Sequence, residues 1–148
     1  MFPLKKIMCP VDFSEHSFKA LKIAREMAEK FSAELYIPHI ILPVPLVPTP
    51  PHPVSFDVAT YRENLKENSQ KTLQKIIEEK TSDSIQTFAI VEQGDPAHEI
   101  MKIVKEKKID LIVISTHGHS GLHHLIFGSV AEKIIRHTSC PVLTIRIR

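Results

Sequence analysis

The amino-acid sequence predicts a three-layer α/β fold, in which a five-stranded parallel sheet has helices on both faces. Short apolar runs alternate with segments whose apolar residues recur at helical spacing, in the order β-α-β-α-β-α-β-α-β. One run, "LIVI", is apolar at every position, as expected of a buried parallel strand. With 148 residues, 43% hydrophobic and 24% charged, the chain fits one globular domain over residues 1–148. The connections between parallel strands are expected to be right-handed crossovers, which put the helices on the two faces of the sheet.

Composition limits the classes of function. The formal net charge is +2 and the basic residues are interspersed with acidic ones, so nothing indicates a nucleic-acid partner. No apolar run approaches the roughly 20 residues that span a bilayer, so we expect a cytoplasmic protein without a membrane partner. Cys9 and Cys140 are expected to be free thiols, as is usual in that compartment.

The first strand and helix are predicted within residues 5–31. A short apolar run from Lys5 is followed by apolar residues at helical spacing up to Phe31. Ser14 is the expected N-cap, because its hydroxyl can accept a hydrogen bond from a backbone N–H that would otherwise be unpaired. The segment "ELYIPHII", residues 34–41, is the second predicted strand.

A proline-rich segment follows at residues 42–56 and contains six of the eleven prolines. Such a density excludes a helix or a central strand. We expect a long surface loop that is partly polyproline, and a docking motif for a proline-recognition protein is the alternative.

The next predicted elements are a helix over residues 57–80, whose apolar residues lie among many charges, and a strand, a helix and a strand between residues 84 and 115. Asp95 followed by Pro96 predicts the start of the middle helix, since a carboxylate cap precedes a ring already set at helical φ. A last helix over residues 130–137 and a strand over residues 140–148 complete the chain.

The closing strand is expected at an edge of the sheet. Polar residues alternate there with apolar ones: Thr144, Arg146 and Arg148 against Leu143, Ile145 and Ile147. Its apolar residues Val142, Leu143, Ile145 and Ile147 also suit strand pairing with a second copy of the chain, which would cover an exposed sheet margin.

Polar residues follow the first and fourth predicted strands. Asp12 comes after Pro10 and Val11, and Ser115 begins the stretch that leads into a glycine-rich segment. Ligands of open parallel sheets bind at the carboxyl ends of the strands, where the strand order reverses. Asp12 could therefore accept from an adenosine ribose hydroxyl, or it could simply cap the turn after the strand; the residues alone do not decide.

The segment from Gly118 to Lys133 holds three of the four glycines, Gly118, Gly121 and Gly128. Glycines allow close backbone approach or positive φ. Ser129 with Glu132 matches the S-x-x-E capping box, which predicts Ser129 as the cap of the following helix. That role is compatible with anion binding, because a helix N-terminus presents N–H groups and partial positive charge to a phosphate.

The motifs together resemble the nucleotide-binding branch of the universal stress protein family. The resemblance covers the whole chain: "IMCPVDFSE", the "GDP" turn, "DLIVISTHG", the pattern G-x2-G-x9-G-[S/T] and "GSVAEKIIRHTSCPVLTI". It implies the strand order 3-2-1-4-5, a homodimer formed through the last strand, and binding of ATP, ADP or AMP with Mg²⁺. It also implies a dimeric stress-response sensor or regulator whose nucleotide state biases its interaction with an unknown protein partner.

Carried over residue by residue, the resemblance implies a specific binding site. Asp12 would hold the ribose and adenine side, and Pro10, Val11 and Ile40 would form the wall of the adenine pocket. The phosphate side would comprise His117, Gly118, Gly128, the Ser129 hydroxyl and the Val130 backbone N–H. The first glycine of the motif is replaced by Ser115, whose side chain could crowd the ligand or donate a hydrogen bond to it.

Several alternatives stay open. The histidines His117, His119, His123 and His124 could hold a metal, but the ligand spacing gives no support, and exposed histidines that attract phosphate at acidic pH are the simpler interpretation. The chain has no G-x4-G-K-[S/T], G-x-S-x-G or H-E-x-x-H motif, so an enzyme would be at most a slow ATPase. A dimeric interaction protein that has lost nucleotide binding, motivated by Ser115, is the remaining possibility.

Overall fold

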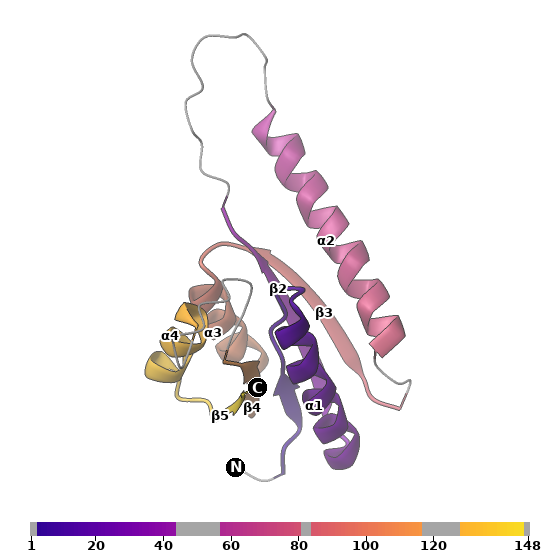
Figure 1. Ribbon diagram of the computed structural model, residues 1–148, viewed down its shortest axis with the longest axis vertical. Coiled ribbons are helices and arrows are strands. Elements are labelled where there is room, and N and C mark those ends of the chain that lie inside the picture. The colour runs from indigo at the N-terminus through magenta and orange to yellow at the C-terminus, as the bar shows by residue number, and fades with distance from the viewer. Residues whose placement is uncertain (1–2, 44–56, 81–83, 117–127, 147–148) are drawn as a thin grey trace.

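The computed structural model describes residues 3–43, 57–80, 84–116 and 128–146 (Figure 1). Within these residues the elements are β1 (Lys6–Met8), α1 (Glu15–Phe31), β2 (Glu34–Ile41), α2 (Val58–Lys80), β3 (Thr87–Gln93), α3 (Pro96–Lys107), β4 (Leu111–Ser115), α4 (Ser129–His137) and β5 (Val142–Ile145). The predicted alternation of strands and helices is confirmed. Almost all of the proline-rich segment, with the docking motif considered for it, lies outside the described residues.

The strands form one parallel sheet in the order β3-β2-β1-β4-β5, which confirms the fold class and the strand order. β1 lies between β2 and β4, with Lys6 opposite Glu34 and Ile7 opposite Leu111. The chain moves outward from β1 in one direction for β2 and β3, and in the other for β4 and β5. The strand order therefore reverses beside β1, so the carboxyl ends of β1 and β4 adjoin at the switch point.

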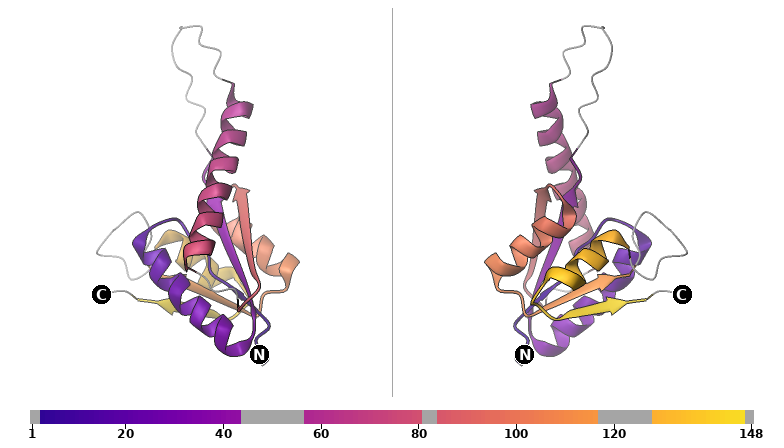
Figure 2. Two further views of the ribbon diagram at one scale, coloured as in Figure 1. Left: turned by 90° about the vertical axis from the view of Figure 1, so that its right-hand side faces the viewer. Right: turned by 90° about the vertical axis from the view of Figure 1, so that its left-hand side faces the viewer.

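Two apolar cores lie on opposite faces of the sheet. On one face, α1 and α2 pack through residues such as Ala20, Leu21 and Leu73. On the other face, α3 and α4 pack through residues such as Ile100 and Ile134. The turned views show the same division into three layers (Figure 2). Among the described residues, no helix is both long and apolar enough to cross a membrane.

Local sequence signals explain where most helices begin. The Ser14 hydroxyl accepts from the Ser17 backbone N–H at 3.2 Å and caps α1, as predicted. The Asp95 carboxylate accepts from the His98 N–H at 3.0 Å and caps α3, with Pro96 in its first turn. α2 begins after Asp57, whose carboxylate accepts from the Ala59 N–H at 3.0 Å.

β5 lies at the edge of the sheet, as its alternating pattern predicted, but it is shorter than expected. Within the described residues it comprises Val142–Ile145, whereas residues 140–148 were predicted; Ile147 and Arg148 lie outside the described residues. Cys140 precedes it as a buried residue whose thiol lies 3.3 Å from the Ile109 carbonyl oxygen, so this part of the chain packs against the loop before β4 instead of pairing in the sheet.

Candidate functional site

A cleft of about 410 Å³ opens at the switch point, at the carboxyl ends of the strands. Its floor and walls come from the residues after β1, the second half of β2, the start of α3, the end of β4 and the start of α4. The lining residues are Pro10, Val11, Asp12, Ser17, Pro38, Ile40, Leu42, Asp95, Pro96, Ala97, Ile100, Ile114, Ser115, Thr116, Gly128, Ser129, Val130, Ala131 and Lys133.

The structure brings most of the predicted site residues together in this cleft. Those that line it are Pro10, Val11, Asp12, Ile40, Ser115, Gly128, Ser129 and Val130. His117 and Gly118 lie outside the described residues, as do His119, Gly121, His123 and His124. Segments separated by more than a hundred residues in sequence thus contribute to one cavity, as expected for a switch point in a parallel sheet.

The wall of the cleft is mainly apolar. Val11, Ala97, Ile100 and Ile114 are almost completely buried, with exposed fractions between 1% and 6%. They come from the loop after β1, from α3 and from β4, so the wall is held by the sheet and by a helix packed on it. Such a surface can exclude water from a flat ring, while polar groups at its ends fix the ring's orientation.

Asp12 forms the turn between β1 and α1. Its Oδ1 atom accepts from the Ser14 N–H at 3.0 Å and from the Ser14 hydroxyl at 2.5 Å. Ser14 in turn caps α1, so the carboxylate, the turn and the helix start form one hydrogen-bonded unit. The turn interpretation of Asp12 is confirmed, and the half-buried carboxylate also lines the cleft.

An aromatic contact supports this turn and was not anticipated from the sequence. Phe13 has φ of 64°, in the left-handed region that non-glycine residues seldom occupy. Its ring stacks on His39 of β2 with 4.0 Å between ring centroids, and His39 Nδ1 lies 2.9 Å from the Val11 carbonyl oxygen. Contacts with His39 of β2 therefore hold Phe13 in this conformation and fix the position of the neighbouring Asp12.

The start of α4 faces the cleft from the other side. The Gly128 N–H donates to the Thr116 carbonyl at 2.6 Å, and Gly128 is the N-cap residue with φ of −67°. This φ is open to any residue, so the glycine is not required for positive φ. A Cβ at this position would come 3.4 Å from the Thr116 oxygen, which is an ordinary contact.

The predicted capping box is wrong. α4 begins one residue earlier than expected, Ser129 is its first helical residue, and no side chain caps it. Glu132 instead pairs with Arg136 at 2.9 Å. The bond from Gly128 to Thr116 fixes the earlier start. Within the described part of the chain, the N–H groups of the first turn therefore have no side-chain acceptor and confer partial positive charge on this end of the cleft.

Ser115 ends β4 beside Ile145 and is 8% exposed. It lines the cleft at the position where the motif has its first glycine. A ligand in the cleft would therefore meet a serine where the motif has a glycine. This is the one departure from the motif that falls within the described site residues.

An ion pair at the cleft was not predicted. Lys133 of α4 lies with its Nζ 3.4 Å from Asp95 Oδ2, and both side chains are more than half exposed. The hydrogen bond from the His98 N–H, and then Lys133, hold the pKa of the Asp95 carboxyl below its usual range. Lys133 is the only cation among the described residues that line the cleft.

Two sequence signals could have identified this pair. Asp95 follows the carboxyl end of β3, the same edge of the sheet as Asp12, and Lys133 is four residues after Ser129, on the same side of its helix. Gly94 positions Asp95: its N–H donates to the Ile41 carbonyl at 3.0 Å, and its φ of 154° is one that side chains rarely adopt.

The two cysteines are free thiols, as predicted. Complete burial raises the pKa of Cys9 far above its usual range, and burial raises the pKa of Cys140 to about 11. Both groups are therefore protonated thiols at neutral pH, which makes them poor nucleophiles. Across the described ranges, no group of three or more His, Cys, Asp or Glu residues could hold a metal ion.

Comparison with known proteins identifies close relatives. The model of the universal stress protein family matches residues 3–146. Universal stress protein MJ0531 of Methanocaldococcus jannaschii is 36% identical over 142 residues, which cover 96% of this chain and 82% of that protein. Universal stress protein YxiE of Bacillus subtilis is 34% identical over 146 residues, which cover 95% of this chain and 98% of that protein.

Solved structures share the fold. Protein MJ0577 of Methanocaldococcus jannaschii superposes with a TM-score of 0.74 at 25% identity, covering 98% of this chain and 97% of that one. An Arabidopsis thaliana universal stress protein family member with AMP bound has a TM-score of 0.62 at 19% identity over 97% of this chain and 92% of its own. A universal stress protein in complex with cAMP has a TM-score of 0.68 at 17% identity over 97% of each chain.

Proposed function

The chain belongs to the universal stress protein family, and from this premise we propose that it binds an adenine nucleotide in the cleft at the ends of β1 and β4. The observation that carries the proposal is the polarity of the cleft. Asp12 lies on one side of an apolar wall, and the start of α4, without a side-chain cap, lies on the other. A nucleotide has the same sequence of chemical groups: a flat ring, a sugar with hydroxyls and a chain of anions.

The residues fit the parts of this ligand. Val11 and Ile40 offer apolar surface to adenine, and the Asp12 carboxylate can accept hydrogen bonds from ribose hydroxyls. On the phosphate side, the Ser129 hydroxyl, the Val130 N–H and the Lys133 ammonium can each donate to oxygen. Solved members of the fold with AMP and with cAMP support adenine as the base, and Mg²⁺ would accompany the phosphates of ATP.

The biological role that follows is that of a dimeric regulator or sensor in the stress response. In this proposal, the bound nucleotide biases the interaction with a protein partner by favouring one arrangement of the cleft. Binding can shift such an equilibrium only through a difference in affinity for the two arrangements. The start of α4 is the element best placed to respond, because it lines the cleft and its helix leads along the chain into β5.

The homodimer would form through the exposed edge of β5. Leu143 is 37% exposed there, whereas Ile145 packs partly against the core formed with α1. Leu143→Lys is thus the informative variant, because it places like charges at a two-fold interface with little effect on the core. Sedimentation velocity should show a dimer for the wild type and a monomer for the variant; a dimer in both would reject this edge.

The decisive test is calorimetric titration of nucleotide-stripped protein with ATP, ADP and AMP in the presence of Mg²⁺. We expect saturable binding in the wild type and at least about tenfold weaker binding in Gly128→Ala. The added methyl group is compatible with the fold, since it meets only an ordinary contact, but it obstructs close approach of a phosphate to the backbone. Ser69→Ala on α2 is the matched control and should bind like the wild type.

Ser115 favours a second candidate function, a dimeric interaction protein of the same fold without nucleotide. Ser115 lines the cleft and carries a side chain where the motif has a glycine. If the stripped wild type gives no heat with any of the three nucleotides while Ser115→Gly binds ATP, this second function replaces the first. Binding by the wild type would exclude it.

A further inference from the structure

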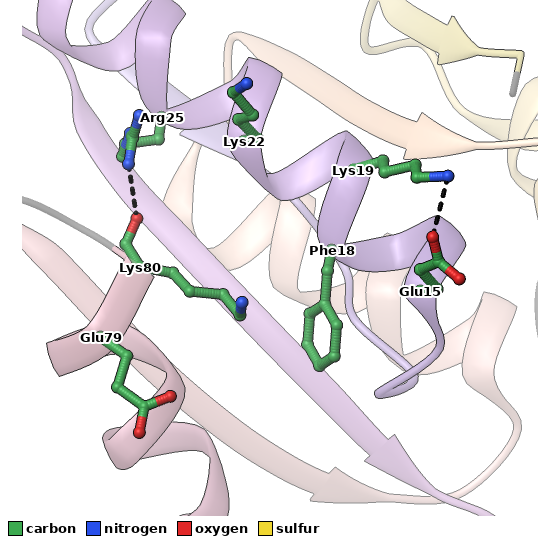
Figure 3. Close-up of a pocket in the computed structure, with 7 residues that line it drawn as sticks. All are labelled: Glu15, Phe18, Lys19, Lys22, Arg25, Glu79 and Lys80. Atoms are coloured by element: carbon green, nitrogen blue, oxygen red, sulfur yellow. Dashed lines mark hydrogen bonds and ion pairs between the residues drawn. The ribbon is translucent and has the colours of Figure 1, made fainter.

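A second hollow, of about 400 Å³, lies between α1 and the last turn of α2 and shares no lining residue with the cleft (Figure 3). We call it the basic groove and define it by the four cations that line it, Lys19, Lys22, Arg25 and Lys80. The first three recur every three residues along α1, so they extend over about 9 Å of the helix. Lys80 faces them from the end of α2.

The groove carries an excess of positive charge. Its two carboxylates are each paired with a lysine: Glu15 pairs with Lys19 of the groove itself at 3.0 Å, and Glu79 pairs with Lys75, outside the groove, at 3.8 Å. Among the described residues, no carboxylate lies within ion-pair distance of Lys22 or Lys80. Two cations are therefore available to an anionic ligand without breaking an existing ion pair.

Arg25 and Phe18 give the groove a defined shape. The Arg25 guanidinium donates to the Lys80 carbonyl at 3.0 Å and lies 3.6 Å from Glu29, so it joins the two helices. The Phe18 ring points toward the Lys80 side chain, whose ammonium group is 5.1 Å from the ring centroid (Figure 3). The groove thus combines charged groups with one apolar ring beside Lys80.

The helix end at the groove discriminates between kinds of anion. Compact phosphate sites use the N–H groups of a helix N-terminus. The first turn of α1 lines the groove, but its start is capped by the Ser14 hydroxyl, and α2 presents its C-terminus here, whose carbonyl groups repel concentrated negative charge. Three of the four cations are lysines, whose flexible side chains adapt to separated charges instead of gripping one compact group. Carboxylates spread along a chain suit this arrangement better than a phosphate.

We propose that the basic groove docks an acidic segment of a partner protein, with carboxylates on Lys22 and Lys80 and an apolar side chain on Phe18. This interaction is separate from the proposed nucleotide site, because the groove and the cleft share no lining residue. It provides a surface through which the chain can recognise another protein by charge. Partners would then be proteins with exposed segments in which acidic residues alternate with apolar ones.

The test uses the full chain and a fluorescein-labelled peptide of alternating glutamate and alanine with one central leucine. Fluorescence anisotropy should show saturable binding that Lys22→Glu/Lys80→Glu weakens at least about tenfold, as two attractive charge pairs become repulsive. The matched control is Lys30→Glu/Lys66→Glu, which changes the net charge equally at exposed lysines of the same two helices outside the groove. Circular dichroism should show that both variants are folded.

Four results would overturn the proposal. Equal weakening in both double variants would mean that only the net charge attracts the peptide, and no binding by the folded wild type would mean that the groove does not recognise carboxylates. Binding of inorganic tripolyphosphate that depends on Lys22 and Lys80, without binding of the glutamate peptide, would make the groove a phosphate site. Equal binding of a glutamine version of the peptide would also contradict a charge-based interaction.

Discussion

The cleft and the basic groove have nearly the same volume, about 410 and 400 Å³, but they are built from different parts of the fold. The cleft is formed where strand ends and helix starts converge, and its wall includes side chains such as Ile114 that are 6% exposed. The groove lies on the outer surface of two helices, where the Lys19 side chain is 49% exposed. The fold therefore provides one site suited to recognising shape and another suited to recognising charge.

This difference has an energetic basis. A buried apolar wall contributes about 25 cal/mol for each Å² of apolar ligand surface that it removes from water, and this contribution depends little on salt. An exposed ion pair contributes at most about 1 kcal/mol, and salt screens it. The two sites should consequently respond differently to mutation and to ionic strength. The expected effects range from a large loss of ligand affinity to a change of a fraction of a kcal/mol in stability.

The largest effect is expected for Asp12→Asn. Nucleotide affinity should fall by about tenfold to about a hundredfold, because a hydrogen bond to a charged group contributes about 1.5–3 kcal/mol. The asparagine carbonyl can still accept from the Ser14 N–H, so the turn before α1 remains. Calorimetric titration with ATP measures the loss. Binding of the acidic peptide in the basic groove should be unchanged, and a parallel loss there would point to a damaged fold.

The next largest effect is expected from salt, which should weaken ligand binding at the basic groove but not at the cleft. Raising NaCl from about 50 mM to about 500 mM shortens the screening length to a few Å, so peptide affinity at the basic groove should fall about tenfold. Adenosine carries no charge, and its affinity for the cleft should stay within about twofold. Anisotropy and calorimetry on the same preparation measure both. A strong salt dependence of adenosine binding would contradict the apolar character assigned to the cleft.

Lys133→Ala should have a smaller and more selective effect. Lys133 is the one cation among the described lining residues of the cleft, and it is more than half exposed, so its loss should weaken ATP binding by less than about tenfold. AMP should lose less than ATP, and adenosine should lose nothing, because the ammonium can reach only the phosphates. Lys66→Ala on α2 is the control. Equal losses for ATP and adenosine would show that Lys133 acts through the fold.

The comparison also shows which features the sequence could predict. Ser14 and Asp95 were found as caps because each acts on a backbone N–H three residues away. The alternation of strands and helices and the buried character of β4 follow from periodicity in the same local way. The positions of the cleft residues follow from one topological rule, that ligands bind at the carboxyl ends of parallel strands. The strand order itself came from the family resemblance.

Features that depend on contacts between distant segments could not be predicted. The S-x-x-E pattern placed the start of α4 wrongly, because the bond between Gly128 and the Thr116 carbonyl decides it. The pair of Lys133 with Asp95 joins α4 to α3 across 38 positions. The basic groove depends on Arg25 meeting the end of α2, 55 positions away, and nothing in the sequence distinguishes Lys19, Lys22 and Lys80 from other lysines.

The smallest effect concerns the charge of Asp95 at the edge of the cleft. Asparagine caps helices as well as aspartate does, so Asp95→Asn keeps the cap of α3 and removes only the charge that Lys133 and the helix start attract.

Because the folded state lowers the pKa of the Asp95 carboxyl, its charge stabilises the protein at pH values above the usual carboxyl pKa, and this stabilisation is lost as the pH falls through the folded pKa. At neutral pH the variant should therefore be less stable by at most about 0.5 kcal/mol, since the pair is exposed. Urea unfolding of both proteins between pH 7 and about pH 3 should show this difference shrinking once the pH falls below about pH 4. A difference that is undiminished at about pH 3 would mean that the asparagine disturbs the cap itself, and the charge of Asp95 would then have no measurable part in holding α3 and α4 together.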